Sequence, residues 1–144
     1  MLLLLTTFFA SCKTNPDKQA EEKVKKFFVE YETIGVIKAV DNLYSDNKLK
    51  NSIDSALTNI KNQLSRIETQ VGRYNGYNFI TRKKAGDSFL QLSYIVKYES
   101  VPVRFSFQFY KPKNEWTIYN FKFDTDISDE VEKAANLYFL NLDK

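Results

Sequence analysis

Three aspartates in a short acidic segment are the residues of this sequence best suited to holding a metal ion. Asp124, Asp126 and Asp129 stand close together, and alternate carboxylates can converge on calcium. A helix-loop-helix calcium loop needs glycine at its sixth position and glutamate at its twelfth. Counted from Asp124, those positions hold Asp129 and Ala135. We therefore expect no metal site and no cofactor, and we interpret Asp126 or Ser128 as the N-cap of a helix.

The residue types needed for most nucleophilic catalysis are missing. The 144 residues include no histidine and one cysteine, which excludes serine–histidine and cysteine–histidine pairs and ordinary zinc sites. Gly72 and Gly76 lack the lysine that ends a phosphate-binding loop, so we interpret them as a turn. We assign no catalytic residue. A carboxylate base in a cavity of the fold stays open as an alternative, because general acid–base catalysis needs only a carboxylate with a shifted pKa.

The single cysteine follows a short apolar run. Residues 2–10 are too few to span a membrane but match the apolar core of a secretory signal. The residues at 9–12, Phe-Ala-Ser-Cys, resemble the bacterial lipobox, in which the cysteine is diacylated before cleavage. We expect a signal peptide over 1–11, lipid on Cys12, a tether over 12–17 and one α+β domain over 18–144. The alternative is a signal without lipid; either predicts export, and the lipidated form predicts an anchor in the cell envelope, at the outer membrane or periplasmic face.

The charge is only slightly positive, with 21 Lys+Arg against 18 Asp+Glu and a net charge of +3. Five basic residues, at 82–84, 111 and 113, fall where two strand connections are expected. This is less basic than the stripe of a typical nucleic-acid-binding protein, so we expect no nucleic-acid partner. Solvated turns explain these residues most simply, and contact with anionic lipid or polysaccharide is the alternative.

The spacing of apolar residues indicates helices followed by strands. A spacing of three and four predicts helices over 18–34, over 37–44 and over 49–71, with Gly72 as the last stop. A period of two then predicts strands over 77–81, 90–98, 101–109 and 115–123. Another apolar stripe, from Ile127 to Leu142, predicts a final helix. The expected class is α+β, with N-terminal helices packed on a curved four-stranded antiparallel meander and a C-terminal helix.

The last strand does not keep one alternation. Trp116 and Ile118 are apolar at even positions, whereas Tyr119 and Phe121 are apolar at odd ones. A β-bulge near residues 118 and 119, or apolar surface on both faces, would explain the change.

Aromatic residues of the strands are the candidates for binding. Most simply they form a packed core, but a curved sheet often leaves a cavity at its open end. The residues that would line such a pocket are Tyr94, Tyr98, Phe107 and Tyr119. A second set is expected on the outward face of the sheet, where a partner or the final helix would cover it. Its members are Phe89, Ile95, Tyr110, Trp116 and Ile118.

A family resemblance is carried by residues 27–31 with Gly35, residues 39–44 and the strand end at 114–121. Through these residues the chain resembles the NTF2-like, cystatin-like superfamily over about residues 18–125. The resemblance implies helices against a curved antiparallel sheet. Some members are ketosteroid-isomerase-like enzymes with an aspartate base and a tyrosine donor, and many are binding or dimerisation modules. We find no motif that places that pair here. The expected function is a non-catalytic cell-envelope lipoprotein that binds a small apolar ligand or an envelope protein through its sheet. An isomerase- or hydrolase-like enzyme and a structural homodimer are the alternatives.

Overall fold

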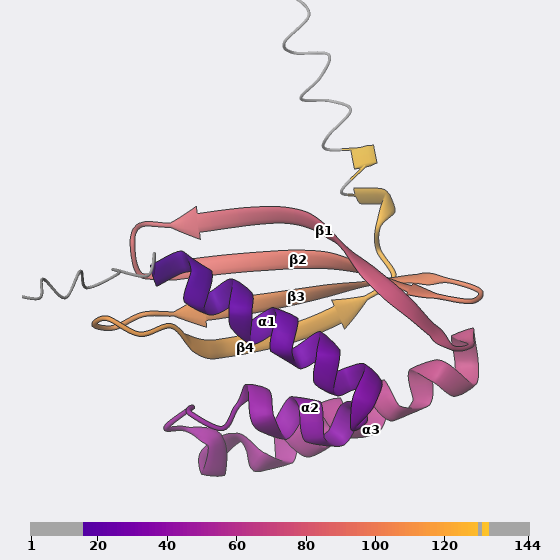
Figure 1. Cartoon of the computed structure of the whole chain (residues 1–144), viewed down its shortest axis with the longest axis horizontal. Coiled ribbons are helices and arrows are strands. Elements are labelled where there is room, and N and C mark those ends of the chain that lie inside the picture. Colours follow the sequence, from indigo (N-terminus) through magenta and orange to yellow (C-terminus); the bar gives the residue numbers. More distant parts are fainter. Residues whose placement is uncertain (1–15, 130, 133–144) are drawn as a thin grey trace, which may run out of the picture.

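The computed structural model describes residues 16–129, 131 and 132, and these form an α+β domain (Figure 1). Its helices are α1 (Pro16–Thr33), α2 (Val36–Leu43), the 3-10 helix η1 (Lys50–Ile53) and α3 (Asp54–Val71). Its strands are β1 (Tyr74–Ala85), β2 (Phe89–Tyr98), β3 (Pro102–Tyr110) and β4 (Thr117–Asp124). The strands form one antiparallel sheet in the order β1-β2-β3-β4. The predicted α+β class and four-stranded meander are confirmed.

Several predicted boundaries differ from those of the structure. β1 spans 12 residues instead of the predicted 77–81, and its pairing with β2 is irregular in two places, which breaks the alternation of its side chains. α3 begins at Asp54 because the preceding residues form η1. Of the predicted final helix, 128, 129, 131 and 132 are helical, and its remaining positions beyond 132 lie outside the described residues.

Helix α1 lies across one face of the sheet, as Figure 1 shows, while α2 and α3 lie together beyond the β4 edge. Ala20, Val24, Phe27 and Phe28 are at most 1% exposed and share one side of α1, as the spacing of three and four requires. Val29 points the other way and is 59% exposed. The helix therefore buries its apolar stripe against the sheet.

Aromatic rings join α1 to the inner face of the sheet. The Phe27 ring centroid lies 5.2 Å from that of Phe107 and 5.5 Å from that of Phe121. Phe28 stacks on Tyr77 of β1 with the centroids 3.8 Å apart. Contacts at these distances add to the free energy gained by removing the rings from water. The two neighbouring phenylalanines thus connect α1 to both edge strands and to the centre of the sheet.

Glycine ends α3 for a steric reason. Gly72 has a φ of 89°, and a Cβ built on it would lie 2.6 Å from the Cβ of Glu99. The Ser100 N–H also donates to the Val71 carbonyl at 2.9 Å, which holds the end of α3 against the β2–β3 turn. Only glycine suits both the positive φ and the close approach. The predicted helix stop at Gly72 is confirmed.

A β-bulge interrupts β4. Gln108 pairs with Asn120 and the next residue of β3, Phe109, pairs with Ile118, so Tyr119 is an extra residue. Ile118 and Phe121 consequently both face the core, at 0% and 2% exposure. Tyr119 turns outward and is 62% exposed. The bulge that the change of alternation predicts is confirmed.

We expect Phe27→Ala to destabilise the domain by about 3–5 kcal/mol, because it leaves a cavity between α1 and the sheet. Val29→Ala, in the same helix but on its exposed side, should change the free energy of unfolding by less than about 0.5 kcal/mol. Urea unfolding of both variants measures the difference. Equal effects would show that α1 is not anchored through Phe27.

Candidate functional site: a groove beside the edge of β4

Of the four residues predicted to line a pocket, the structure brings Tyr94 and Phe107 together, with ring centroids 5.9 Å apart, but they do not line a cavity with Tyr119. Tyr94, Tyr98 and Phe107 lie on the inner face and are 6%, 6% and 0% exposed. Tyr119 lies on the opposite face because of the bulge. Phe28 packs against both Tyr94 and Phe107, with ring centroids 5.4 Å and 5.8 Å away. The inner aromatic residues are therefore core, and α1 occupies the space in which we expected a ligand.

Burial also determines the acidity of the inner tyrosines. It raises the pKa of Tyr94 to about 12, with a smaller contribution from the negative charge of Glu21. Tyr98 and Tyr31 share a hydrogen bond of 2.7 Å between their hydroxyls, and burial raises both pKa values. These hydroxyls stay protonated at neutral pH.

The predicted outward face is only partly outward. Phe89 and Ile95 are half-buried there, and Tyr110 is 45% exposed. Trp116 and Ile118 are 0% exposed, so their predicted outward position is wrong. Ile118 turns inward because the bulge changes the alternation of β4, and Trp116 precedes the strand altogether.

Polar side chains cover the centre of the outer face. The side chain of Asn120 donates to Gln108, Gln108 donates to Gln91, and Gln91 donates to Ser93, over distances of 3.0–3.3 Å. The Ser93 hydroxyl, 0% exposed, bonds that of Ser106 at 3.2 Å. An internally bonded row of this kind suits a solvated sheet face. The exposed apolar side chains of the outer face, Tyr110 and Tyr119, lie at its margin.

An apolar groove of about 510 Å³ lies beside the free edge of β4. Three of its lining residues, Leu49, Tyr110 and Tyr119, are large apolar side chains left 63%, 45% and 62% exposed. The rest of the lining is Asn47, Lys48, Ile53, Pro112, Thr117, Ile118 and Asn120. Sequence analysis singled out Tyr110, Ile118 and Tyr119 but missed the wall formed by 47–53.

Asn47 and Tyr44 fix that wall to the strand. The Asn47 side chain donates to the Ile118 carbonyl at 2.7 Å and accepts the Leu49 N–H at 2.7 Å. The Tyr44 hydroxyl accepts a hydrogen bond from the Phe121 backbone, although burial still raises the pKa of Tyr44 to about 12. Backbone groups of an edge strand are thus satisfied by side chains, and the segment after α2 stays beside β4.

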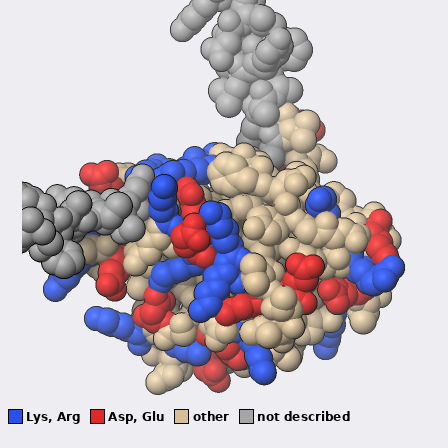
Figure 2. Space-filling view, viewed as in Figure 1, with Lys and Arg blue, Asp and Glu red and all other residues tan. Residues whose placement is uncertain are grey.

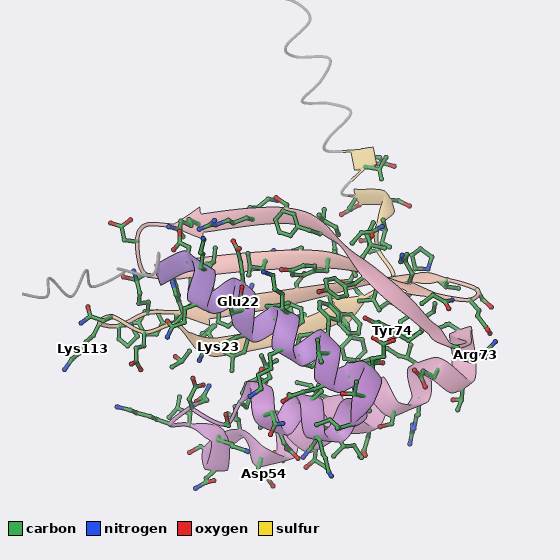
Figure 3. The ribbon with its side chains drawn as sticks, in the orientation of Figure 1. Glu22, Lys23, Asp54, Arg73, Tyr74 and Lys113 are labelled. Carbon is green, nitrogen blue, oxygen red and sulfur yellow. The ribbon has the colours of Figure 1, made fainter. Side chains whose placement is uncertain are left out.

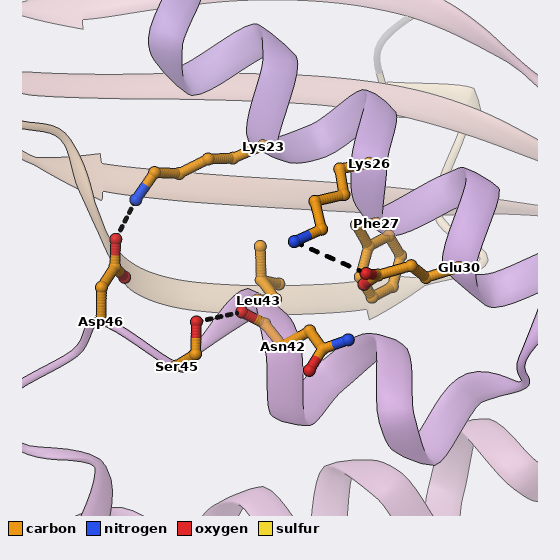
Figure 4. Close-up of a pocket in the computed structure, with 8 residues that line it drawn as sticks. All are labelled: Lys23, Lys26, Phe27, Glu30, Asn42, Leu43, Ser45 and Asp46. Atoms are coloured by element: carbon orange, nitrogen blue, oxygen red, sulfur yellow. Dashed lines mark hydrogen bonds and ion pairs between the residues drawn. The ribbon is translucent and has the colours of Figure 1, made fainter.

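A smaller hollow of about 200 Å³ lies between α1 and α2 (Figure 4). Lys23 pairs with Asp46 across it, and Lys26 lies 3.7 Å from Glu30. The Ser45 hydroxyl donates to the Asn42 carbonyl at 2.7 Å. The Lys23–Asp46 pair thus links α1 to the segment after α2 across this hollow.

Within residues 16–129 no three carboxylates or thiols are grouped so as to hold a metal ion. In the acidic segment the Asp124 carboxylate accepts the Asp126 N–H at 3.0 Å and pairs with Arg104 at 2.9 Å. Over the same residues, Ser93 and Ser106 are the buried polar side chains, and both face outward. No carboxylate of this part of the chain lies inside the sheet to act as a base.

No family model, curated protein or solved structure matches this chain. Among its described helices, none is both long and apolar enough to cross a membrane.

We expect the buried tyrosines to make the free energy of unfolding fall at high pH. An unfolded tyrosine ionises near pH 10, whereas folded Tyr94 ionises near 12, so between these values the unfolded state loses its proton first. Tyr94 alone should remove about 1 kcal/mol of stability between pH 9 and pH 11. Over this pH interval, the free energy of unfolding of Tyr94→Phe, measured in urea, should therefore fall by about 1 kcal/mol less than that of the parent. Phe109→Leu, which disturbs the core but removes no phenol, should keep the parent's pH dependence; a Tyr94→Phe variant that also keeps it would contradict this account.

Proposed function

We propose that this protein is a non-catalytic, lipid-anchored binding protein of the bacterial cell envelope, whose site is the groove beside β4. The observation that carries the proposal is the convergence of Leu49, Tyr110 and Tyr119 on one hollow. Exposed apolar side chains scattered singly need no explanation, whereas a group of them around a concavity is typical of a binding site.

The lining favours a small apolar ligand. A volume of about 510 Å³ lies within the usual range for ligand pockets, about 300–1,000 Å³. Leu49, Ile53 and Pro112 offer aliphatic contact, and the two tyrosines offer ring faces. The Asn120 amide and the Thr117 hydroxyl supply a few polar contacts that would orient a ligand. A catalytic role has less support, because the groove lining includes no carboxylate.

The NTF2-like relationship belongs to the same proposal. Its support is the order of helices before a four-stranded meander, with the first helix across the sheet. Binding and dimerisation modules are common in that superfamily, as the resemblance implies. Here the aromatic residues of α1 fill the space that a cavity-forming relative would leave open.

N-phenyl-1-naphthylamine, a neutral dye that fluoresces in apolar surroundings, tests the groove. We expect saturable binding, with an affinity about tenfold lower in Leu49→Ser and in Tyr119→Ser because each removes apolar contact. Val29→Ser and Ile37→Ser replace residues that are exposed to a similar degree, 59% and 53%, and lie elsewhere, and they should bind the dye as the parent does. Equal loss in all four variants would refute a site at the groove.

Mass spectrometry of the chain purified from bacterial membranes tests the anchor. We expect a mature chain that begins at Cys12 and carries the added mass of a diacylglyceryl group. Cys12→Ser should remove this mass, while Ser11→Ala, which keeps a small residue before the cysteine, should retain it. A membrane-derived chain with an unmodified cysteine would contradict the anchor without affecting the groove.

A further inference from the structure

Three separate parts of the chain meet at one end of the domain. They are the start of α1, the β1–β2 turn and the β3–β4 loop, which lie together in Figure 1. The Lys111 N–H donates to the Ser88 carbonyl at 2.8 Å and so joins the turn to the loop. The Trp116 N–H donates to the Gln19 side chain at 3.0 Å and so joins the loop to α1. In Figure 3, Lys113 marks this end and Arg73 marks the opposite one.

Basic residues outnumber acidic ones where the two strand connections meet. Residues 82–88, which include the end of β1 and the β1–β2 turn, and the β3–β4 loop at 111–115 carry five basic residues and two acidic ones, Asp87 and Glu115. Across α1 itself, by contrast, basic and acidic side chains alternate (Figure 2). Lys83 and Lys113 are exposed and form no ion pair within the part of the chain that the structure describes.

The nearest acids on α1 are already neutralised. Asp17 pairs with Arg82 and, at 2.6 Å, with Lys84, while Glu21 lies 3.3 Å from Arg82. Burial alone would raise the pKa of Asp17, but the hydrogen bond from Lys84 and the charges of Arg82, Lys84 and Lys111 outweigh it and lower that pKa. Asp17 is therefore a stable anion that offsets charge locally and leaves Lys83 and Lys113 to act outward.

We propose that this end of the domain docks on an anionic phospholipid surface through Lys83, Lys113 and the exposed loop around Pro112. Lysine ammonium groups are attracted to lipid phosphates, and each basic residue close to an anionic leaflet adds to the binding. Pro112 and Tyr110 beside them can enter the headgroup region, where tyrosine is favoured. Lys48 and Lys113 both border a second hollow of about 510 Å³ that shares Lys48, Pro112 and Thr117 with the groove, so the groove adjoins the proposed docking surface.

This inference rests on the proposed function in one respect, the lipid anchor that would hold the start of α1 near the membrane. A lipid on Cys12 would lie within about 14 Å of Pro16, since four extended residue steps reach no further. So short a tether brings the start of α1, and the basic turn and loop beside it, close to the headgroups. Binding through the lysines themselves does not require the lipid and can be measured without it.

The experiment uses the full chain carrying Cys12→Ser and vesicles of phosphatidylcholine, with or without 30% phosphatidylglycerol, where the percentage is about what an anionic leaflet holds. The quantity measured by sedimentation is the ratio of the two partition coefficients, so any affinity of the apolar leader for lipid cancels. We expect a ratio well above one that falls towards one in 0.5 M NaCl, a concentration of roughly the order at which screening becomes strong. The double variant Lys83→Glu/Lys113→Glu should lower the ratio at least about tenfold.

Lys38→Glu/Lys97→Glu is the matched control, since it changes the net charge equally with two exposed lysines away from this end. It should keep most of the parent ratio. Equal loss in both double variants would mean that only net charge matters and would overturn the docking site, as would a parent ratio of one. Binding to an anionic polysaccharide but not to vesicles, with the same dependence on Lys83 and Lys113, would also overturn it. None of these outcomes bears on the lipid attached to Cys12 or on the groove.

Discussion

The packing of two adjacent phenylalanines of α1 into the inner face of the sheet is the constraint on which the other features depend. Phe27 contacts rings of β3 and β4, and Phe28 contacts rings of β1, β2 and β3. One helix turn therefore contacts rings from all four strands. Because these rings pack between α1 and the sheet, they occupy the space in which the inner-face pocket was predicted. Three exposed apolar side chains instead converge at the margin, where β4 meets the segment after α2.

The margin is shaped by the needs of an edge strand. Unpaired backbone groups of β4 would invite pairing with another chain, and Tyr44 and Asn47 occupy them from the side. Holding this segment against β4 places Leu49 opposite Tyr119, whose outward position follows from the bulge. The same contacts that protect the edge thus form the groove. The residues that cap the edge strand, Tyr44 and Asn47, and the inserted residue Tyr119 therefore also shape the candidate site.

The sequence predicts correctly those faces of helices and strands that depend only on the spacing of neighbouring apolar residues. β2 and β3 alternate without interruption and α1 has one apolar stripe, so their inner faces follow from the pattern. The predicted positions of Tyr119 and Ile118 are wrong because one extra residue reverses the alternation of β4. The pattern locates such a bulge only to within a residue or two. The groove could not be predicted for another reason. Leu49 and Tyr119 are 70 positions apart in the sequence, and they come together because hydrogen bonds hold the segment after α2 beside β4, which no local period encodes.

In the proposed docking, the lysines and the apolar groove contribute to different steps of association. The lysines would act over roughly a Debye length, about 8 Å at physiological salt, and so would orient the domain before contact. The apolar groove acts only at contact, since dispersion and desolvation need touching surfaces. A ligand that leaves a membrane would first meet the lysines and then the ring faces of Tyr110 and Tyr119. Because the two effects differ in range, removing charge should alter how the domain meets the surface and leave the intrinsic affinity of the groove unchanged.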